Sequence, residues 1–587
     1  MDRSGLSTRA ADDVTTERPP DAALDGDGAD EADQEPAGGS TKTGRPPGLS
    51  AGWITAAAAL LAVLPYLYDA GRALIDGGHG VLWGDGALEE LATRDVWRWH
   101  QLLGPYSRFG WHHPGPALFY WLALPDRLLG SGGPGTEIGI ILLNGAAAAA
   151  IVVLLGRRWG HWLAVWAAGC VLLLHLTLGG AIWRDTWNPF AVIMPMTLMV
   201  VLAADGATGA VASWCWALVA GSFAVQTHIS TGAVVVVVLA ASLGGLVWMW
   251  RTRRGVQWAA WWASAGLALA ILMWIPPLID AVRHHPSNLS LILKFFTARH
   301  PVHSLFEATR TSLTAASTVF LGRHGSLGDV VIRSTGALVL GTVLLLAVII
   351  ATSWVGIRRG SRLGLWLMCL SVIGIAVAVL SGTRVVGDIA QYLVIWQASF
   401  AITLLLGLGA AVLTPEPSAV PLRRHSSHHA SAGSLGVRVA SIIAAAGTLA
   451  AAAVAVGQQA ALAGPTSFPG YAPPGEVRMA SDAVRSALRP SDRVVRLTIA
   501  TQSAWPTVAG VALELERGGR RTTEVATPGY GFDATVLFGL NRRPTGREDV
   551  DVEFERIGPN EVQGAPAHGQ PLATLGSLVL LINRRAP

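Results

Sequence analysis

Long apolar segments separated by short polar ones fill the chain from residue 51 to residue 457. Each is close to the length of about 20 residues that a helix needs to cross a bilayer. The stretch 116–130 is shorter and contains Pro125, so we expect a juxtamembrane or re-entrant helix there. The pattern predicts eleven membrane spans, at 51–70, 137–156, 159–178, 188–204, 211–227, 231–250, 257–276, 331–351, 363–381, 388–413 and 438–457.

The two ends of the chain differ from this transmembrane part, residues 50–460. Residues 1–49 are rich in Asp, Glu, Ala, Gly, Pro and Thr, a composition typical of a disordered tail. The tail shows no signal-peptide pattern, so we expect the first apolar run to remain as a span. Residues 461–587 have the mixed pattern of a soluble domain.

Within this C-terminal domain, apolar residues at helical spacing predict a helix at 476–488. Short apolar runs with Gly, Pro and Asn between them predict strands at 494–500, 509–515 and 577–583. The charged residues are scattered and form no catalytic motif, so we expect a scaffold or an acceptor-binding module. The predicted fold class is mainly α, a polytopic transmembrane helical bundle with a small C-terminal α/β domain.

The composition excludes an ordinary soluble enzyme, because 51% of the residues are hydrophobic and only 14% are charged. The net charge of +4 is small, and basic residues fall as pairs between apolar runs. This distribution indicates the positive-inside rule rather than nucleic-acid binding. The three cysteines lie within apolar runs, so no disulfide framework is indicated.

The basic clusters predict the orientation in the membrane. If all of them are cytoplasmic, every turn after residue 137 alternates correctly. We therefore expect a multi-pass plasma-membrane protein whose N-terminus is cytoplasmic and whose C-terminal domain is extracytoplasmic. The polar segments between spans, of which the loop 71–115 is the largest, then share the outer face. The clusters are Arg157-Arg158, Arg251 to Arg254, Arg358-Arg359 and Arg423-Arg424.

The outer loop 71–115 holds the strongest candidate for chemistry. Asp85 lies between two glycines and is expected to act as a general base on an acceptor hydroxyl or to ligate a divalent cation. A helix N-cap is the alternative interpretation, since Ala-Leu-Glu-Glu-Leu follows closely. Glu89 would support the site, although a solvated helix face is the simpler interpretation of Glu89 and Glu90.

The second half of the loop combines imidazoles with a cation and aromatic surfaces. His112 and His113 precede Pro-Gly-Pro, so the chain there is expected to be extended. The two histidines either bind a phosphate or a metal, or hydrogen-bond to the backbone. Tyr106, Arg108 and Trp111 are of the residue types that bind sugars and phosphates.

Further candidates follow at the outer ends of later spans. Arg184 and Asp185 are flanked by tryptophans and either belong to the site or form an interfacial charge pair. Gln226 and His228 either line the site or hydrogen-bond between helices. A guanidinium at a span end would neutralise a lipid-linked phosphate or simply snorkel to the interface. The candidate for this is Arg384, with Asp388 and Tyr392 beside it.

Taken in order, these motifs resemble the GT-C superfamily of integral-membrane glycosyltransferases. The resemblance covers roughly residues 51–410 and rests on Asp85, on Trp111-His-His-Pro114, on Asp185 and on the Gln226-x-His228 pair. It is strongest to the protein O-mannosyltransferase and aminoarabinose transferase group and to actinobacterial arabinofuranosyl- and mannosyltransferases. Gly-Asp-Gly and His-His-Pro-Gly-Pro depart from the usual Asp-Glu and His-Pro-Pro, so the donor and acceptor do not carry over.

The resemblance implies transfer of a sugar from a polyprenyl-phosphate carrier to a glycan, lipid or protein acceptor of the cell envelope. Asp85 matches the catalytic aspartate of the family's first loop, and Asp185 matches its second acidic residue. Some relatives hold a divalent cation, Mg²⁺ or Mn²⁺, with these acids and others do not. The Ala, Gly and Arg bias resembles an actinobacterial protein. A single displacement at the anomeric carbon predicts inversion of configuration.

Two functions from other classes stay open. A transporter or flippase for lipid-linked sugars would place polar residues at mid-membrane and repeat its two halves. No internal repeat is evident in this sequence, and the polar groups cluster at one face. A non-catalytic protein of envelope assembly is the other alternative.

Overall fold

The computed structural model describes residues 49–78, 80–130, 134–252, 254–323, 334–414, 430–461, 474–526, 534–557 and 569–584. The expected N-terminal tail, except for its last residue, lies outside the described residues, as does the Arg423-Arg424 pair.

Ten helical segments within the described residues are long and apolar enough to cross a membrane. The eleventh expected span is the shorter helix α8 (Val211–Thr227). All eleven expected spans are thus helical, and the predicted fold class is confirmed. The ten segments comprise α1 (Leu49–Asp76), α4 (Gly135–Trp159), α5 (His161–Leu178), α6 and α7 (Asn188–Ala191 and Ile193–Ala207), α9 (Gly232–Arg251), α10 and α11 (Ala260–Met273 and Ile275–Arg283), α15 (Thr335–Arg359), α16 (Arg362–Gly382), α17 and α18 (Gln391–Val394 and Ala398–Leu413) and α19 (Ala430–Ala461).

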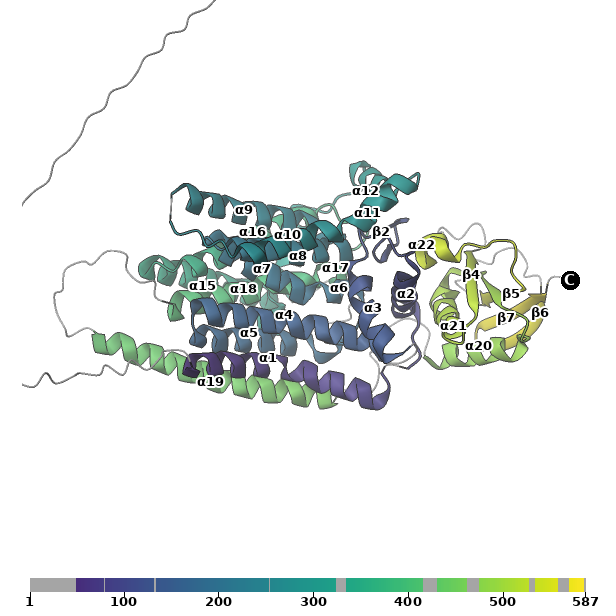
Figure 1. Ribbon diagram of the computed structural model, residues 1–587, viewed down its shortest axis with the longest axis horizontal. Helices are drawn as coiled ribbons and strands as arrows, with labels where there is room; N and C mark the ends of the chain where they lie inside the picture. Colours follow the sequence, from purple (N-terminus) through teal and green to yellow (C-terminus); the bar gives the residue numbers. More distant parts are fainter. Residues whose placement is uncertain are drawn as a thin grey trace, which may run out of the picture. The chain divides into compact units, whose positions relative to one another are not determined.

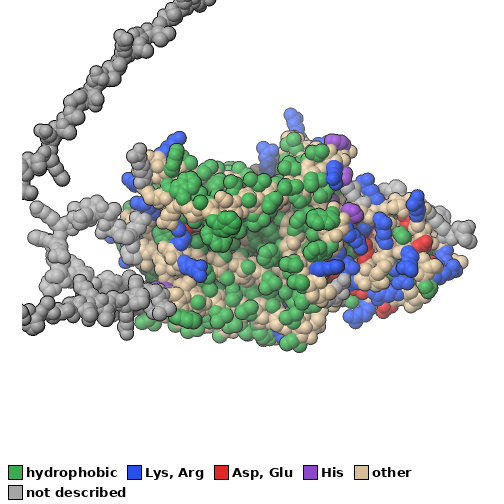
Figure 2. Space-filling view, in the orientation of Figure 1, with side chains coloured by type: hydrophobic (Ala, Val, Ile, Leu, Met, Phe, Trp, Pro, Cys, Tyr) green, Lys and Arg blue, Asp and Glu red, His purple; other side chains and the backbone are tan. Residues whose placement is uncertain are grey.

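The bundle is packed through small residues that let helices approach closely. Gly409 on α18 faces the indole of Trp166 on α5, and Gly374 on α16 faces the ring of Phe400 on α18, with no room for a β-carbon at either glycine. Outside this core the surface is apolar as well. On the face seen in Figure 2, hydrophobic side chains cover the bundle, as expected for a protein embedded in lipid.

Helix α4 runs from one polar end of the bundle to the other. Near its start, Glu137 pairs with Arg184, and near its end, Arg158 donates from Nε to Asp205 at 2.8 Å. Its 25 residues correspond to about 37 Å, enough to cross a membrane. The basic cluster at Arg157-Arg158 and the candidate acidic residues therefore lie at opposite ends. Which end faces the cytoplasm remains a prediction.

The stretch 116–130 forms the short helix α3 (Ala117–Leu129), which contains Pro125. It packs against α4 and against α2 (Gly84–Asp95). With 13 residues it is not among the membrane-length helices of the described chain, in line with the expectation that it does not make a full crossing.

The C-terminal domain contains a five-stranded sheet in the order β4-β3-β5-β7-β6. Strand β3 (Val494–Ile499) is parallel to β4 (Arg521–Ala526) and to β5 (Val550–Arg556). Strand β7 (Leu578–Arg584) is antiparallel to β5 and to β6 (Gln570–Leu575). The expected helix is α20 (Pro474–Ala487), and the strands expected at 494–500 and 577–583 are β3 and β7.

The strand expected at 509–515 is wrong, because this segment belongs to helix α21 (Trp505–Arg517). Pro506 lies in the first turn of this helix. Backbone N–H groups in a first turn have no partner within the helix, so a residue without an N–H is tolerated there. Residues 506–513 are all buried, so the run has no polar face to reveal a helical period. Glu514 is the one charged residue of the expected strand, and a short run this apolar does not distinguish a buried strand from a buried helix.

Helix α2 packs into the hydrophobic core of the C-terminal domain, more than 400 residues away in the chain. Its residues Ala87, Leu88 and Leu91 belong to the same buried cluster as the apolar side chains of α21 and β3. Figure 1 shows α2 beside α21 and the short helix α22 (Ala534–Phe538), and α2 is in contact with both. The loop 71–115 and the C-terminal domain therefore share one hydrophobic core.

Buried ion pairs reinforce this contact. Arg542 donates to Asp95 of α2 at 2.7 Å and to Glu516 of α21 at 2.9 Å, and all three residues are buried. Arg517 reaches Glu90 of α2 in the same way, at 2.5 Å. Glu90 is therefore not on a solvated helix face, and that interpretation of it is wrong.

Replacing Arg542 by Met should destabilise the packing of α2 on the C-terminal domain, because Asp95 and Glu516 would remain buried with only the more exposed Arg98 beside them. Breaking a buried pair in this way typically costs about 3–5 kcal/mol. The matched change Arg485→Met removes a more exposed pair with Glu514 and should cost about 1 kcal/mol or less. Thermal unfolding of both full-length variants in detergent measures the difference. Equal losses of Tm would contradict a special role for Arg542.

Candidate functional site

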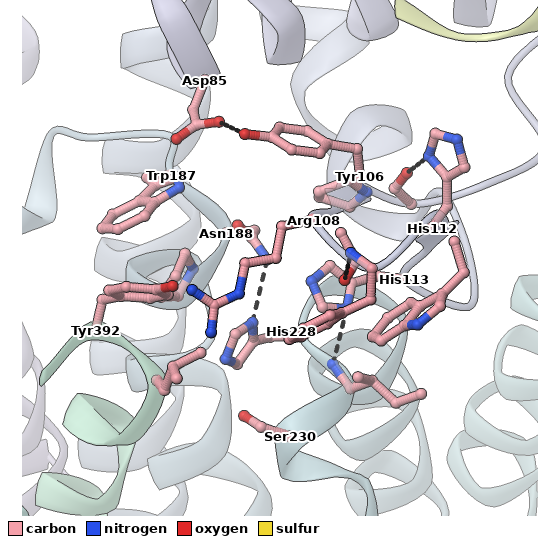
Figure 3. Close-up of a pocket in the computed structure, with 18 of the residues that line it drawn as sticks. Asp85, Tyr106, Arg108, His112, His113, Trp187, Asn188, His228, Ser230 and Tyr392 are labelled. Atoms are coloured by element: carbon pink, nitrogen blue, oxygen red, sulfur yellow. Dashed lines mark hydrogen bonds between the residues drawn. The ribbon is translucent and has the colours of Figure 1, made fainter. Parts of the chain in front are cut away.

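A cavity of about 1310 Å³ is lined by one polar end of the bundle, by the loop 71–115 and by the C-terminal domain. Of the thirteen site residues expected from the sequence, ten line this cavity, and Arg184, Asp185 and Gln226 do not. Figure 3 shows part of its wall. The ten are Asp85, Glu89, Tyr106, Arg108, Trp111, His112, His113, His228, Arg384 and Tyr392.

Asp85 is the second residue of α2 rather than its N-cap. The N-cap is Trp83, whose side chain makes no capping hydrogen bond, so the N-cap interpretation of Asp85 is wrong. Gly84 begins the helix with a φ of 55°, in the left-handed region that favours glycine. The Asp85 carboxylate instead accepts a hydrogen bond of 2.7 Å from the Tyr106 hydroxyl (Figure 3).

The environment of Asp85 moves its pKa toward neutrality. Burial raises the pKa of Asp85 to about 6, the hydrogen bond from Tyr106 works in the opposite direction, and repulsion by Asp185 adds to the rise. A carboxylate with such a pKa is ionised at neutral pH yet accepts a proton far more readily than an exposed aspartate does. Asp85 therefore has the properties of a general base.

Glu89 and Asp185 lie close to Asp85. Glu89 is buried, so the expectation of a solvated position is wrong, and one of its oxygens accepts a bond of 3.1 Å from the Asn188 backbone N–H. Burial raises the pKa of Glu89 well above its usual range, and repulsion by Asp185 and Asp85 adds to the rise. Asp185 accepts a bond of 2.9 Å from the Trp187 N–H. Glu89 therefore holds a proton more readily than an exposed glutamate does, beside the base candidate Asp85.

The histidines are held by a two-stranded hairpin, β1 (Tyr106–Ser107) and β2 (Trp111–His112). The His112 N–H donates to the Asn288 side chain at 2.7 Å, and the Asn288 amide donates back to the His112 carbonyl at 2.9 Å. The next N–H, that of His113, donates to the Pro105 carbonyl at 2.8 Å. The hairpin is therefore fixed to the helix α12 (Asn288–Thr297).

Hydrogen-bond partners assign the protons of two cavity histidines. His113 accepts at Nδ1 from the Ile229 backbone N–H at 3.1 Å. His228 accepts at Nδ1 from the Asn188 amide at 3.1 Å, and the same amide also donates to the Thr227 carbonyl. The neutral form of each ring therefore carries its proton on Nε2.

Both of these rings are neutral at ordinary pH. Burial lowers the pKa of His228 to about 4, and burial together with repulsion from His228 and His112 holds the pKa of His113 well below its usual range. The ring centroids of His113 and His228 are 5.2 Å apart. The pair thus supplies neutral N–H donors rather than positive charge.

His112 differs from this pair. Its Nδ1 lies 3.2 Å from the carbonyl of Gly104, so Nδ1 must donate there and Nε2 is left as the acceptor. Burial lowers the pKa of His112 to about 4. Of the two sequence-based interpretations, backbone hydrogen bonding is what the structure records for His112 and His113.

Two guanidinium groups supply the positive charge of the cavity, Arg108 and Arg384, and no other Lys or Arg of the described chain lines it. Arg108 donates to the Val386 carbonyl at 3.0 Å and lies over the Phe109 ring. Figure 3 shows its guanidinium directed toward Tyr392. Arg384 is exposed on the loop after α16.

Arg184 and Gln226 hold elements together outside the cavity. Arg184 pairs with Glu137 at 2.6 Å, which fixes the segment leading to Asp185. The Gln226 amide donates to the Met273 carbonyl at 2.9 Å, joining α8 to α10. Gln226 also lies against Gly115, where a β-carbon would collide with its side chain. The structural alternative considered for Gln226, a hydrogen bond between helices, matches this geometry.

Sequence reasoning missed several residues that line the cavity. Asn188 and Ser230 are single polar residues at the starts of apolar spans. Their place beside Asp185 and His228 in the sequence could have identified them as site residues. Gln502 and Trp505 carried no such signal, because only the packing of the C-terminal domain on α2 brings them to the cavity.

A divalent cation at Asp85 and Asp185 stays a prediction. Within the described ranges, no group of three or more His, Cys, Asp and Glu side chains is arranged to hold a metal ion. Mg²⁺ is commonly bound by one or two carboxylates together with substrate phosphate oxygens and water. The two aspartates would suit a cation that arrives with a phosphate-bearing substrate.

Comparison with known proteins finds a similarity in fold. No family model and no curated protein matches the sequence. The fold is similar to the apo form of an oligosaccharyltransferase from Archaeoglobus fulgidus, with a TM-score of 0.37 and 13% sequence identity. The similarity covers 82% of this chain and 65% of the archaeal chain, so the protein spans less than two thirds of its structural neighbour.

Proposed function

We propose that the protein is a membrane glycosyltransferase of the GT-C type. It transfers a sugar from a polyprenyl-phosphate donor to a hydroxyl of a cell-envelope acceptor, with inversion at the anomeric carbon. The observation that carries the proposal is the Asp85 carboxylate, half-buried, hydrogen-bonded to Tyr106 and placed in the wall of a large cavity that also holds two arginines.

The reaction is a single displacement. Asp85 takes the proton of the acceptor hydroxyl as that oxygen bonds to the anomeric carbon of the donor sugar. The bond between this carbon and the phosphate oxygen breaks, and the polyprenyl phosphate leaves with the electron pair. The Tyr106 hydroxyl fixes one carboxylate oxygen of Asp85, which orients the base for this transfer.

Arg108 and Arg384 are suited to the donor phosphate. The negative charge on the leaving phosphate grows as the bond breaks, and preorganised cations and N–H donors stabilise such a transition state. The Nε2 protons of His113 and His228 add neutral donors beside the two guanidinium groups. Because these imidazoles stay neutral, they do not attract the base Asp85 into an ion pair.

Aromatic side chains of the wall would hold the donor sugar. Trp187 and Tyr392 lie 4.9 Å apart, between centroids, on the same wall as Asp85 and Arg108. A sugar held there would have its anomeric carbon between the base and the cations. A cation at Asp85 and Asp185 would assist by binding phosphate oxygens, and no step above depends on it.

A transporter is less well supported by this geometry. Its site would lie at mid-membrane, between interrupted helices. The cavity instead opens at the polar end of the bundle and is completed by the C-terminal domain. A non-catalytic role would not explain why Asp85 lies in the cavity wall, hydrogen-bonded to Tyr106.

Asp85→Asn should keep the fold and lose the proton acceptor, since the amide is nearly isosteric with the carboxylate. We expect the transfer rate to fall by about 10²–10⁴-fold, as is typical when a general base is lost. Asp482→Asn, an exposed position of the C-terminal domain, serves as the matched control. Transfer from a radiolabelled polyprenyl-phosphate sugar by the purified proteins measures both. A wild-type rate in Asp85→Asn would remove Asp85 from the mechanism.

The pH profile should report the pKa of Asp85. A protonated Asp85 cannot accept a proton, so kcat/KM should fall about tenfold per pH unit below the pKa of about 6. The Tyr106 hydrogen bond stabilises the ionised carboxylate and lowers this pKa. Tyr106→Phe should therefore shift the acidic limb to higher pH. An unmoved limb would show that another group controls it.

Arg384→Ala should weaken donor use strongly, and Arg384→Lys partly, because lysine keeps the charge and loses the two-pronged hydrogen bonding of the guanidinium. Arg299→Ala, an exposed arginine that does not line the cavity, should have little effect. Transfer rates measured against donor concentration separate these variants. An unchanged donor dependence in Arg384→Ala would favour a guanidinium that only snorkels to the interface.

A further inference from the structure

The C-terminal domain contributes an uncharged wall to the cavity, here called the C-terminal wall. The side chains that form it come from two segments, the turn after β3 and helix α22. None of the described residues that the domain contributes to the cavity is charged, in contrast to the arginines on the bundle side. The wall consists of Gln502, Trp505, Val536, Leu537, Phe538 and Gly539.

Gln502 and Trp505 lie just after the carboxyl end of strand β3. In open α/β folds, ligands bind beside such strand ends. From β3 the chain crosses through α21 to β4 on one side, and later returns to β5 on the other side of β3. The carboxyl end of β3 is therefore a topological switch point, where such sheets form a crevice. Gln502 and Trp505 follow directly on this strand end, after Thr501.

The turn is held in place by the neighbouring strand. Thr501 is buried, and its hydroxyl accepts a bond of 3.0 Å from the Arg556 N–H at the end of β5. Gln502 is exposed to the cavity, and Trp505 is partly exposed. The wall thus presents an amide and an indole on a fixed backbone.

The same indole lies next to the base. A β-carbon added at Gly84 would be 3.7 Å from the Trp505 ring, so the indole is in contact with the residue that precedes Asp85. Trp505 also meets the Tyr106 ring edge-on, with 6.0 Å between centroids, and the Tyr106 hydroxyl is the donor to Asp85. A ligand lying on Trp505 would therefore have a group within reach of Asp85.

We propose that the C-terminal wall is the acceptor subsite and that it binds a neutral sugar residue of the acceptor. The apolar face of the sugar ring lies on the Trp505 indole, and the Gln502 amide donates to and accepts from its hydroxyl groups. One further hydroxyl faces Asp85 and is the nucleophile. This inference rests on the proposed function, and it makes the domain the part that selects the acceptor.

The absence of charge on the wall argues for a neutral ligand. An anionic acceptor or the donor phosphate would find no positive charge on this wall, whereas Arg108 and Arg384 offer it on the bundle side of the same cavity. Pockets for small ligands typically combine apolar contact area with a few placed polar groups, as this wall does.

The test uses the full-length protein in lipid nanodiscs, with octyl α-mannopyranoside and octyl α-arabinofuranoside as acceptor probes. Trp505→Ala should raise the KM for the acceptor about tenfold, and Trp505→Phe and Gln502→Ala should raise it a few-fold. The KM for the donor should stay within about twofold in all three, because the donor phosphate is bound elsewhere. Met479→Ala, an exposed change on α20 away from the cavity, is the control.

Two outcomes overturn the subsite. If Trp505→Phe and Trp505→Ala leave the acceptor KM unchanged while Asp85→Asn abolishes transfer, the subsite is wrong and the proposed function stands. If the wild type transfers no sugar, saturation-transfer NMR with the same glycosides decides the subsite separately. The subsite is overturned if wild type, Trp505→Phe and Trp505→Ala give equal signals. Loss of the signal in Trp505→Ala would support carbohydrate binding without transfer.

Discussion

The packing of helix α2 on the C-terminal domain is the contact on which the site depends. Ala87, Leu88 and Leu91 are buried with the domain's core, and Asp95 is buried with Arg542. A helix of 12 residues is marginal by itself in water, so its order comes from tertiary packing. Since Asp85 stands in the first turn of this helix, the C-terminal domain helps to determine where the carboxylate lies.

The burial that fixes α2 also determines the chemistry of the cavity. Removing side chains from water disfavours their charged forms, which raises the pKa of Asp85 and Glu89 and lowers that of the histidines. The consequence is a cavity with two carboxyl groups of raised pKa, neutral imidazoles and two arginines. A fully solvated loop with the same sequence would hold two carboxylates of ordinary acidity.

The sequence was sufficient for the membrane part, because each span is a local signal of length and hydrophobicity that the bilayer itself imposes. It also placed Asp85, Tyr106 and His228 on one face, since alternation of the spans brings their polar ends together. It failed where burial came from distant residues. Glu90 and the segment 509–515 were misinterpreted because their partners, Arg517 and α2, lie far away in the chain.

The two sides of the cavity come from different parts of the chain, and this determines which residues of the site can be substituted independently of the others. On the bundle side, hydrogen bonds to other segments hold His113, His228 and Arg108 in place. Arg384 lies exposed on the loop after α16. The C-terminal wall stands on the turn after β3 and on α22, outside the membrane helices, and none of its residues takes part in the hydrogen bond between Tyr106 and Asp85. On this arrangement, acceptor preference can vary through a few side chains of the wall while the base and the phosphate side stay fixed. The constraint on such variation is Trp505, because this residue of the wall also packs edge-on against Tyr106 and lies next to Gly84 at the start of α2.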